Sequence, residues 1–222
     1  MHLVWSHPTT GAELWCGGMN AGKDASFMKQ NGINCTLSAA SCPPMAQDSR
    51  IKNFGQYDGT GMVAGHWPWE TIKGVVNSVI AELCDGKRVL IACRNGTGRS
   101  ATWCALVLMA LTGDLPRSVC DHLVAIRSVV QFACHTKRRG TSRFVLPEQS
   151  PLEWLESKHG EMAAIAESLA SKKGSDRFQL NGVLPPSRFR DLVKSLGFQE
   201  LEQAGAFLVF RSEEHTSELQ SR

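Results

Sequence analysis

One segment in the middle of the chain places the tightest constraint on its fold. Residues 89–100 read VLIACRNGTGRS, so a short apolar run leads into Cys93, and Arg99 and Ser100 come just before a long apolar stretch. An uninterrupted apolar run of this length is typical of a strand buried on both faces. The stretch 100–112 is apolar on nearly every side, which predicts a helix at the centre of a domain. The segment therefore predicts a central strand, a tight loop and a central helix.

The loop between these two elements has the composition of an anion site. Backbone N–H groups at a helix N-terminus and in the preceding loop form a positive nest, and Gly96 and Gly98 permit the close backbone approach that such a nest needs. A cysteine at the strand end faces those donors, so we expect a lowered pKa for the Cys93 thiol. Arg99 is able to bind two oxygens of a phosphate or sulfate, and Ser100 adds a hydroxyl near the sulfur.

The rest of the first 135 residues alternates between strand and helix patterns, which predicts an α/β fold with a central, mainly parallel sheet flanked by helices. Residues 41–67 are rich in Pro, Gly, Asp and Ser and are predicted to form a loop. The other expected elements are strands at 13–16 and 34–39, a turn at Gly17–Gly18, a helix from Asp24 to Gln30, a helix from Pro68 to about residue 84, and a last helix from Pro116.

The domain organisation is predicted from changes of composition along the chain. Residues 1–135 form the expected main domain, and residues 136–150 form a basic linker that contains Lys137, Arg138 and Arg139. Residues 151–210 form a small, mostly helical module, for which the alternative is a helical extension that packs on the main domain. Residues 211–222 (RSEEHTSELQSR) look like a translated sequencing adapter, and we interpret them as an artefact.

Charge and cysteine spacing limit the classes of function. The net charge of +3 falls short of a nucleic-acid-binding footprint, so we expect no nucleic-acid partner. None of the eight cysteines forms a C-x-x-C pair, and the histidines have no metal spacing, so we expect reduced thiols and no metal or organic cofactor. The longest apolar run, 103–111, is too short for a membrane span. We expect an intracellular protein in the cytoplasm, with the nucleus as the alternative.

The segment around Cys93 resembles the cysteine-based phosphatases of the dual-specificity branch, whose signature is His-Cys-x5-Arg-Ser/Thr. Cys93, Arg99 and Ser100 match that signature, and Gly96 matches its glycine. The resemblance extends over about residues 12–132, where LWCGG at 14–18 is similar to the family's first strand and turn. It implies the cysteine-phosphatase fold and hydrolysis of phosphate monoesters on phosphoproteins, at Tyr and at Ser/Thr, with phosphoinositides as an alternative substrate.

The resemblance also implies roles for single residues. Cys93 would be the nucleophile that forms a cysteinyl-phosphate, Arg99 would bind the phosphate, and Ser100 would assist release of the sulfur. The expected substrate-binding loop consists of Arg94, Asn95, Gly96, Thr97, Gly98 and Arg99.

The family also requires an aspartic acid from a separate loop as general acid and base. Asp58, in the stretch YDGTG just ahead of a helix, is the favoured candidate, and Asp48 is the alternative. Asp85 lies in a turn too close to the central strand to reach the site. The competing interpretation of Asp58 is an ordinary Asp-Gly turn.

One departure from the signature leaves other functions open. Ala92 stands where the family has its histidine, which predicts a less acidic Cys93 and slower catalysis. A catalytically silent relative that binds phosphorylated partners is therefore an alternative function. A rhodanese-like sulfur carrier is another, although the GTGRS run after Cys93 is unexpected there. A faint similarity to PUB-type interaction domains near residues 189–210 adds no chemistry.

Overall fold

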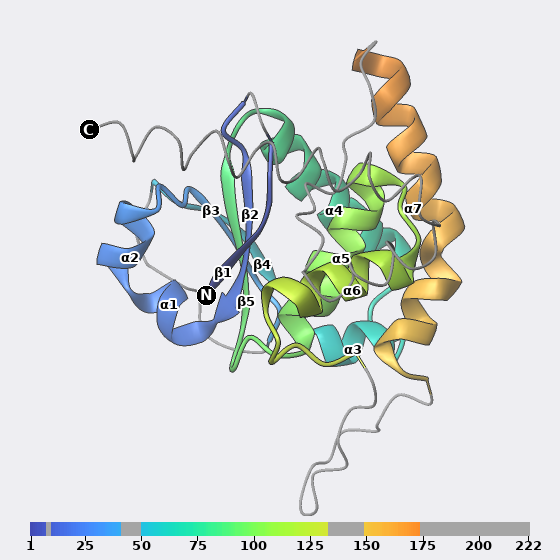
Figure 1. The fold of residues 1–222 in the computed structure, drawn as a ribbon, viewed down its shortest axis with the longest axis horizontal. Helices are drawn as coiled ribbons and strands as arrows, with labels where there is room; N and C mark the ends of the chain where they lie inside the picture. Colours follow the sequence, from blue (N-terminus) through green and yellow to red (C-terminus); the bar gives the residue numbers. More distant parts are fainter. Residues whose placement is uncertain (8–9, 41–49, 133–148, 174–222) are drawn as a thin grey trace, which may run out of the picture. The chain divides into compact units, whose positions relative to one another are not determined.

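The computed structural model describes residues 1–7, 10–40, 50–132 and 149–173, and the fold below concerns these residues (Figure 1). Outside them lie Asp48, residues 136–148 of the linker expected at 136–150, the PUB-like stretch and the adapter-like tail. The strands are β1 (His2–Ser6), β2 (Glu13–Gly18), β3 (Cys35–Ser38), β4 (Lys52–Gln56) and β5 (Arg88–Cys93); the helices are α1 (Met19–Lys23), α2 (Ala25–Gln30), α3 (Gly59–Val63), α4 (Trp69–Cys84), α5 (Arg99–Thr112), α6 (Pro116–Ile126) and α7 (Pro151–Lys173).

The strands form one five-stranded sheet in the order β1-β2-β5-β3-β4. Only the edge pair β1–β2 is antiparallel, and the pairs β2–β5, β5–β3 and β3–β4 are parallel. Strand β5 lies at the centre, where both of its neighbours run in the same direction as itself. The predicted α/β fold with a mainly parallel sheet is therefore confirmed.

Side chains of β5 alternate between two apolar layers, as the two-residue period of a strand requires. Val89, Ile91 and Cys93 face the larger core, which is covered by α3 to α7, whereas Leu90 and Ala92 face a small cluster against α2. Figure 1 shows α1 and α2 on one side of the sheet and the other helices on the opposite side. Burial on both faces explains why the run at 89–92 is uniformly apolar.

Helix α5 occupies the middle of the larger layer. All its residues from Ser100 to Thr112 are buried, and it ends at Gly113, whose φ of 75° is the left-handed conformation of a helix C-terminus. Both features agree with the helix predicted over 100–112. Because β5 and α5 are both almost entirely buried, the loop that joins them is held from both ends.

Three sequence predictions about this region were wrong in detail. Gly17 and Gly18 are not a turn, because they end strand β2 and pair with Ala92 and Cys93. Residues 41–67 are not loop throughout, since β4 and α3 lie within them. The sheet also has an edge strand, β1, in a stretch for which no element was predicted.

Helix α7 belongs to the larger core. Trp154, Leu155 and Met162 are buried in the same cluster as the side chains of α5, and the ring of Trp69 on α4 packs edge-on against Trp154. Helix α7, the described part of residues 151–210, therefore packs on the main domain.

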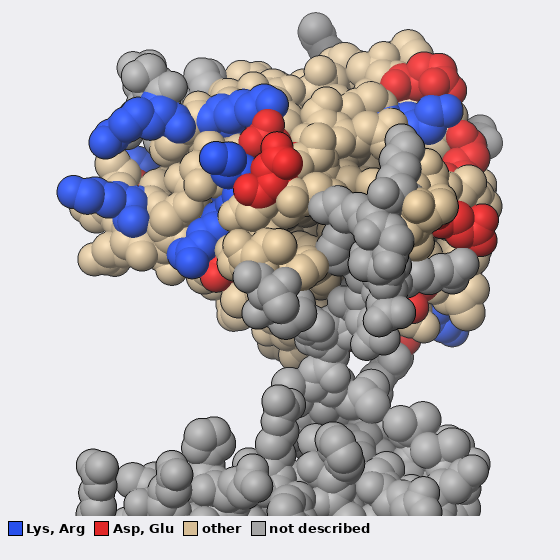
Figure 2. Space-filling model, turned by 90° about the horizontal axis from the view of Figure 1, so that it is seen from above, with Lys and Arg blue, Asp and Glu red and all other residues tan. Residues whose placement is uncertain are grey.

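Charged side chains of both signs occupy the face of the molecule in Figure 2, where Lys and Arg gather on one side and Asp and Glu lie between and beside them. Opposite charges also pair across elements, as in Lys52 with Glu82 and Arg88 with Glu13. Among the helices of the described ranges, none is both long enough and apolar enough to cross a membrane.

Candidate active site

The loop from Cys93 to Arg99 turns tightly at the end of the central strand. Gly96 has a φ of 71°, and a Cβ atom placed on it would lie 2.6 Å from the carbonyl carbon of Gly17 and 2.7 Å from the nitrogen of Gly18. Only glycine fits this combination of left-handed backbone and close approach. The two glycines that end β2 therefore provide the surface on which the cysteine loop rests.

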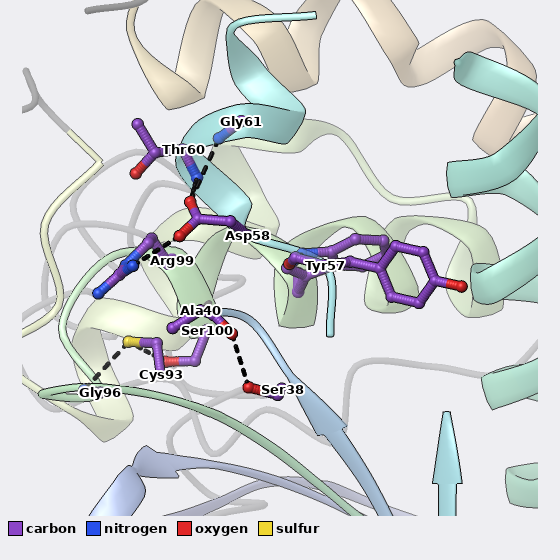
Figure 3. A network of polar contacts seen from close by, with 11 residues as sticks. Ser38, Ala40, Tyr57, Asp58, Thr60, Gly61, Cys93, Gly96, Arg99 and Ser100 are labelled. Carbon is purple, nitrogen blue, oxygen red and sulfur yellow. Dashed lines mark hydrogen bonds and ion pairs between the residues drawn. The ribbon is translucent and has the colours of Figure 1, made fainter. Parts of the chain in front are cut away.

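The sulfur of Cys93 lies among hydrogen-bond donors (Figure 3). The N–H of Gly96 donates to Sγ at 3.2 Å, and the hydroxyl of Ser100 lies 3.4 Å from it. Burial by itself would raise the pKa of the Cys93 thiol, but the Ser100 hydroxyl, the backbone N–H groups of Ser100 and Gly96 and the charge of Arg99 outweigh it and hold the pKa below its ordinary value. The site therefore favours a thiolate at neutral pH more than a free cysteine does.

Ser100 joins two cysteines at the first turn of α5. Its hydroxyl lies 3.4 Å from the sulfur of Cys93 and accepts a hydrogen bond from the thiol of Cys16 at 3.5 Å. Both cysteines and Ser100 are buried. The Cys16 thiol of strand β2 therefore donates a hydrogen bond to the same serine hydroxyl that contacts the sulfur of Cys93, the candidate nucleophile.

Arg99 and Asp58 form an ion pair beside the sulfur. Nη1 of Arg99 donates to Oδ2 of Asp58 at 2.8 Å, and both side chains are only about a quarter exposed, at 28% and 22%. Burial would raise the pKa of Asp58, but the charge and hydrogen bond of Arg99 and the N–H groups of Gly61 and Thr60 hold it below its ordinary value. Without a bound anion, Asp58 is therefore a carboxylate and Arg99 is its partner.

Asp58 also caps helix α3. Its Oδ1 accepts hydrogen bonds from the N–H groups of Thr60 at 2.8 Å and Gly61 at 3.2 Å. At Gly59, an added Cβ would lie 2.9 Å from the carbonyl oxygen of Arg99, so glycine allows the start of α3 to touch the start of α5. The Asp-Gly pair therefore begins a helix rather than forming the ordinary turn that the competing interpretation expected, and this helix start places the carboxylate against Arg99.

The segment before Asp58 is fixed to both neighbouring layers. The carbonyl of Tyr57 accepts a hydrogen bond from the indole N–H of Trp103 on α5 at 2.9 Å, and its N–H donates to Ser38 at the end of β3. The side chain of Tyr57 points away from the cysteine loop in Figure 3. These contacts place Asp58 at the carboxyl edge of the parallel strands, where ligands bind in α/β folds.

The other residues predicted for the site occupy two environments. Arg94 and Asn95 are exposed at the rim of the loop, and Thr97 and Gly98 are half-buried. Ala92 is fully buried in the small cluster on the opposite face of the sheet, among Met28, Ile33 and Leu90. The position that holds histidine in the phosphatase signature is here part of an apolar core.

In the described part of the chain, His, Cys, Asp and Glu side chains form no cluster of three that could hold a metal ion.

Sequence reasoning missed two contributors to the site. Cys16 ends the strand predicted at 13–16, and its thiol reaches Ser100. Arg127 follows α6, the helix predicted from Pro116, and its Nε donates to the carbonyl of Gly96 at 2.8 Å. The spacing of either residue from the loop gives no signal of these contacts, because they depend on tertiary packing.

The fold and the site together define an α/β protein whose central strand ends in a cysteine-containing loop. Its fold is that of the dual-specificity phosphatases. The crystal structure of DUSP15 superposes with a TM-score of 0.54 at 17% identity, covering 75% of this chain and 95% of that one. A human DUSP28 variant gives 0.54 at 16% identity over 74% of this chain and 98% of its own.

A mouse chain described as a dual specificity phosphatase, complexed with zinc tungstate, gives a TM-score of 0.51 at 14% identity, covering 78% of this chain and 92% of that chain. No family model and no curated protein sequence matches this chain. At these identities the likeness concerns the fold, and the fold implied by the sequence resemblance is confirmed.

Proposed function

We propose that this protein hydrolyses phosphate monoesters on phosphoproteins through a cysteinyl-phosphate intermediate. The observation that carries the proposal is the placement of the Cys93 sulfur, which receives the N–H of Gly96 at 3.2 Å beside an ion pair of Arg99 with Asp58. The three groups that the reaction needs therefore lie side by side: a thiolate to attack phosphorus, a guanidinium to bind the phosphate oxygens and a carboxyl group to transfer the proton. The dual-specificity phosphatase fold supports the same activity.

In the first step, the Cys93 thiolate attacks phosphorus, so an S–P bond forms as the bond from phosphorus to the leaving oxygen breaks. The backbone N–H groups of residues 94–99 and the guanidinium of Arg99 stabilise the charge on the phosphoryl oxygens. In the second step water attacks phosphorus and the thiolate leaves, with the Ser100 hydroxyl stabilising the sulfur through the contact at 3.4 Å. Free phosphate is the product.

Asp58 supplies and then recovers one proton. As an acid it protonates the leaving oxygen, and as a carboxylate it takes a proton from the attacking water. The ion pair with Arg99 lowers the pKa of Asp58 in the free protein. A bound phosphate dianion competes for the guanidinium of Arg99, so substrate binding raises the pKa of Asp58 towards the range that an acid catalyst needs.

The fold and the rim of the loop support a proposal for the substrate class. We propose phosphotyrosine and phosphoserine or phosphothreonine side chains as substrates, with phosphoinositides as the alternative. Arg94 is exposed beside the loop, which favours substrates that carry further negative charge. The mouse chain of the same fold was complexed with zinc tungstate, and tungstate is a tetrahedral oxyanion like phosphate, which supports an oxyanion ligand for this fold.

The second candidate function is a catalytically silent protein that binds phosphorylated partners through the same loop. Ala92 favours it, because no histidine stands beside the nucleophile and the position is filled by apolar packing. The lowered pKa of Asp58 also favours it, because a strong acid holds few protons to donate at neutral pH.

Hydrolysis of a generic aryl phosphate, with vanadate as inhibitor, distinguishes the two functions. We expect turnover by the wild type, loss of at least about 10³-fold in kcat for Cys93→Ser, and inhibition by vanadate. Cys84→Ser, a substitution of a half-buried cysteine on α4, is the matched control and should keep full activity. Tight vanadate binding without turnover would select the silent function. Sulfur transfer from thiosulfate would instead select the rhodanese-like alternative.

A further inference from the structure

The backbone carbonyls of the cysteine loop that point away from the Cys93 sulfur, on its outer side, accept hydrogen bonds from neighbouring segments. Three consecutive carbonyls receive hydrogen bonds from residues 127–131, which follow helix α6. Nη2 of Arg127 donates to the carbonyl of Asn95 at 3.4 Å, Nε donates to that of Gly96 at 2.8 Å, and the N–H of Gln131 donates to that of Thr97 at 2.9 Å. The carbonyl before these, that of Arg94, accepts from the N–H of Met19 at 3.4 Å.

These contacts determine which way the loop amides point. In a planar trans peptide the C=O and the N–H of one unit point in opposite directions. Carbonyls of Asn95 and Gly96 that are held on the outside therefore aim the N–H groups of Gly96 and Thr97 to the inside. The bond from the Gly96 N–H to the sulfur of Cys93, at 3.2 Å, agrees with this orientation.

Arg127 is suited to this task by geometry and by charge. Its guanidinium presents donors in a rigid fork, two of which reach adjacent carbonyls while the third, Nη1, lies 2.7 Å from Nδ1 of His2. It is partly buried, and its backbone N–H ends helix α6 by donating to Leu123. The side chain is thus anchored on the loop, on strand β1 and on its own helix.

We propose that Arg127 is a positioning residue, which holds the amides of the cysteine loop towards the anion from outside without touching the substrate. This inference rests on the proposed function, because it assigns to Arg127 the preorganisation of the same oxyanion site. A loop whose amides are already oriented spends no free energy on turning them when the anion arrives.

Three variants separate the effect of the positive charge of Arg127 from the effect of its guanidinium geometry, which allows it to donate to two adjacent carbonyls. Arg127→Met removes both, and Arg127→Lys keeps the charge but is unable to span two carbonyls. Arg117→Met, which removes an exposed arginine from helix α6, is the control. Far-ultraviolet circular dichroism and thermal unfolding identify the variants that fold. If the methionine variant does not fold, the lysine variant carries the test alone.

The first readout is binding of orthovanadate and tungstate by calorimetry. We expect on the order of tenfold weaker binding for Arg127→Lys and a larger loss for Arg127→Met, because charge-assisted hydrogen bonds are lost. Arg117→Met should stay within about twofold of the wild type, as a surface substitution does. Wild-type affinity in Arg127→Lys, or in a folded Arg127→Met, would overturn the inference.

The second readout needs neither turnover nor an anion. The rate of Cys93 alkylation by iodoacetate, followed by mass spectrometry as a function of pH, reports the ionisation of its thiol. We expect the midpoint to move to higher pH in Arg127→Met and by less in Arg127→Lys, because the Gly96 N–H is no longer aimed at the sulfur. An unchanged midpoint in both variants would overturn the inference. A wild type that binds no oxyanion would contradict the proposed function, whereas the alkylation profile would still test Arg127.

Discussion

The two parts of the candidate site are built in different ways. The cysteine loop is a continuous segment between β5 and α5, and its carbonyls at 94–97 are all held from outside by backbone or guanidinium donors. Asp58 comes from a distant segment, and its carboxylate reaches the site through the cap of the short helix α3 and the ion pair with Arg99.

This difference assigns separate physical roles to the two segments. The loop is held in place before any ligand binds, so in the proposed function it supplies affinity for the anion. In the same proposal Asp58 shares Arg99 with that anion, so the protonation of Asp58 depends on whether the anion is present. Substitutions in the loop should therefore weaken binding or folding, whereas substitutions at Asp58 should act on turnover.

Among the substitutions that compare these two segments, the largest effect on turnover is expected at Asp58. We expect Asp58→Asn to lower kcat for an aryl phosphate by about 10²-fold or more, with much less change in KM, because general acid catalysis is lost while the oxyanion loop remains. The measurement is steady-state kinetics as a function of pH, in which the limb that reports the acid should disappear. Asp85→Asn, in the turn after α4, is the matched control and should leave kcat unchanged. A variant whose KM rises while kcat stays constant would show that both segments serve binding.

The next effect concerns the loop itself. We expect Gly96→Ala to lower the free energy of unfolding by about 2–4 kcal/mol, because it adds a Cβ 2.6 Å from Gly17 at a left-handed backbone position. Gly98→Ala is the control within the same loop, since the nearest atom to its added Cβ lies at 3.9 Å and its φ is −136°. Urea unfolding should separate the two variants clearly. Equal stabilities would mean that the loop is not held against the end of β2.

A smaller effect is expected where the phosphatase signature has its histidine. Ala92→His should destabilise the protein by about 1–3 kcal/mol rather than raise its activity, because position 92 is fully buried in the apolar cluster with Met28 and Leu90. Thermal unfolding and aryl phosphate kinetics on the same sample measure both properties. A variant that is as stable as the wild type and also faster would contradict this account of Ala92.

The smallest effect is the pH dependence that the ion pair contributes to stability. The pKa of Asp58 is lower in the folded protein than its ordinary value of 3.8, so its contribution is present above pH 3.8 and is lost as the pH falls through the folded-state pKa. Asp58→Asn keeps a side chain that caps helices but removes the charge. The stability difference between wild type and variant should therefore be constant near neutral pH and shrink in acid. A difference independent of pH would show that the ion pair adds no stability.

The sequence predicted those parts of the fold whose pattern is local. The central strands β2, β3 and β5 and the long helices α4 and α5 were predicted, because burial makes their apolar periodicity strong. Both edge strands were missed: β1 pairs with one neighbour only, and β4 (KNFGQ) is largely exposed and contains Gly55 at a φ of 104°. Helix α3 was missed because its glycines disfavour a helix, and the Asp58 cap and packing against Arg99 stabilise it instead.

In the candidate site too, contacts between residues close in sequence were predicted, whereas contacts that depend on tertiary packing were not. Cys93, Arg99 and Ser100 follow one another closely, and their predicted proximity agrees with the network around the sulfur. The placement of Asp58 beside Arg99 was expected from the family resemblance rather than from its spacing. The contact of Cys16 with Ser100 and that of Arg127 with the loop carbonyls join residues 84 and 31 positions apart, a separation for which a single sequence carries no signal.

The central claim is that the sulfur of Cys93 is a nucleophile towards phosphorus, and trapping the intermediate tests it most directly. Asp58→Asn should slow the second step, so rapid acid quenching during turnover of an aryl phosphate should leave one phosphoryl group on the peptide that contains Cys93. Peptide mass spectrometry locates the group, and Cys93→Ser should carry none. Release of phosphate by the wild type with no phosphoryl group ever found on Cys93, or undiminished turnover by Cys93→Ser, would contradict the account.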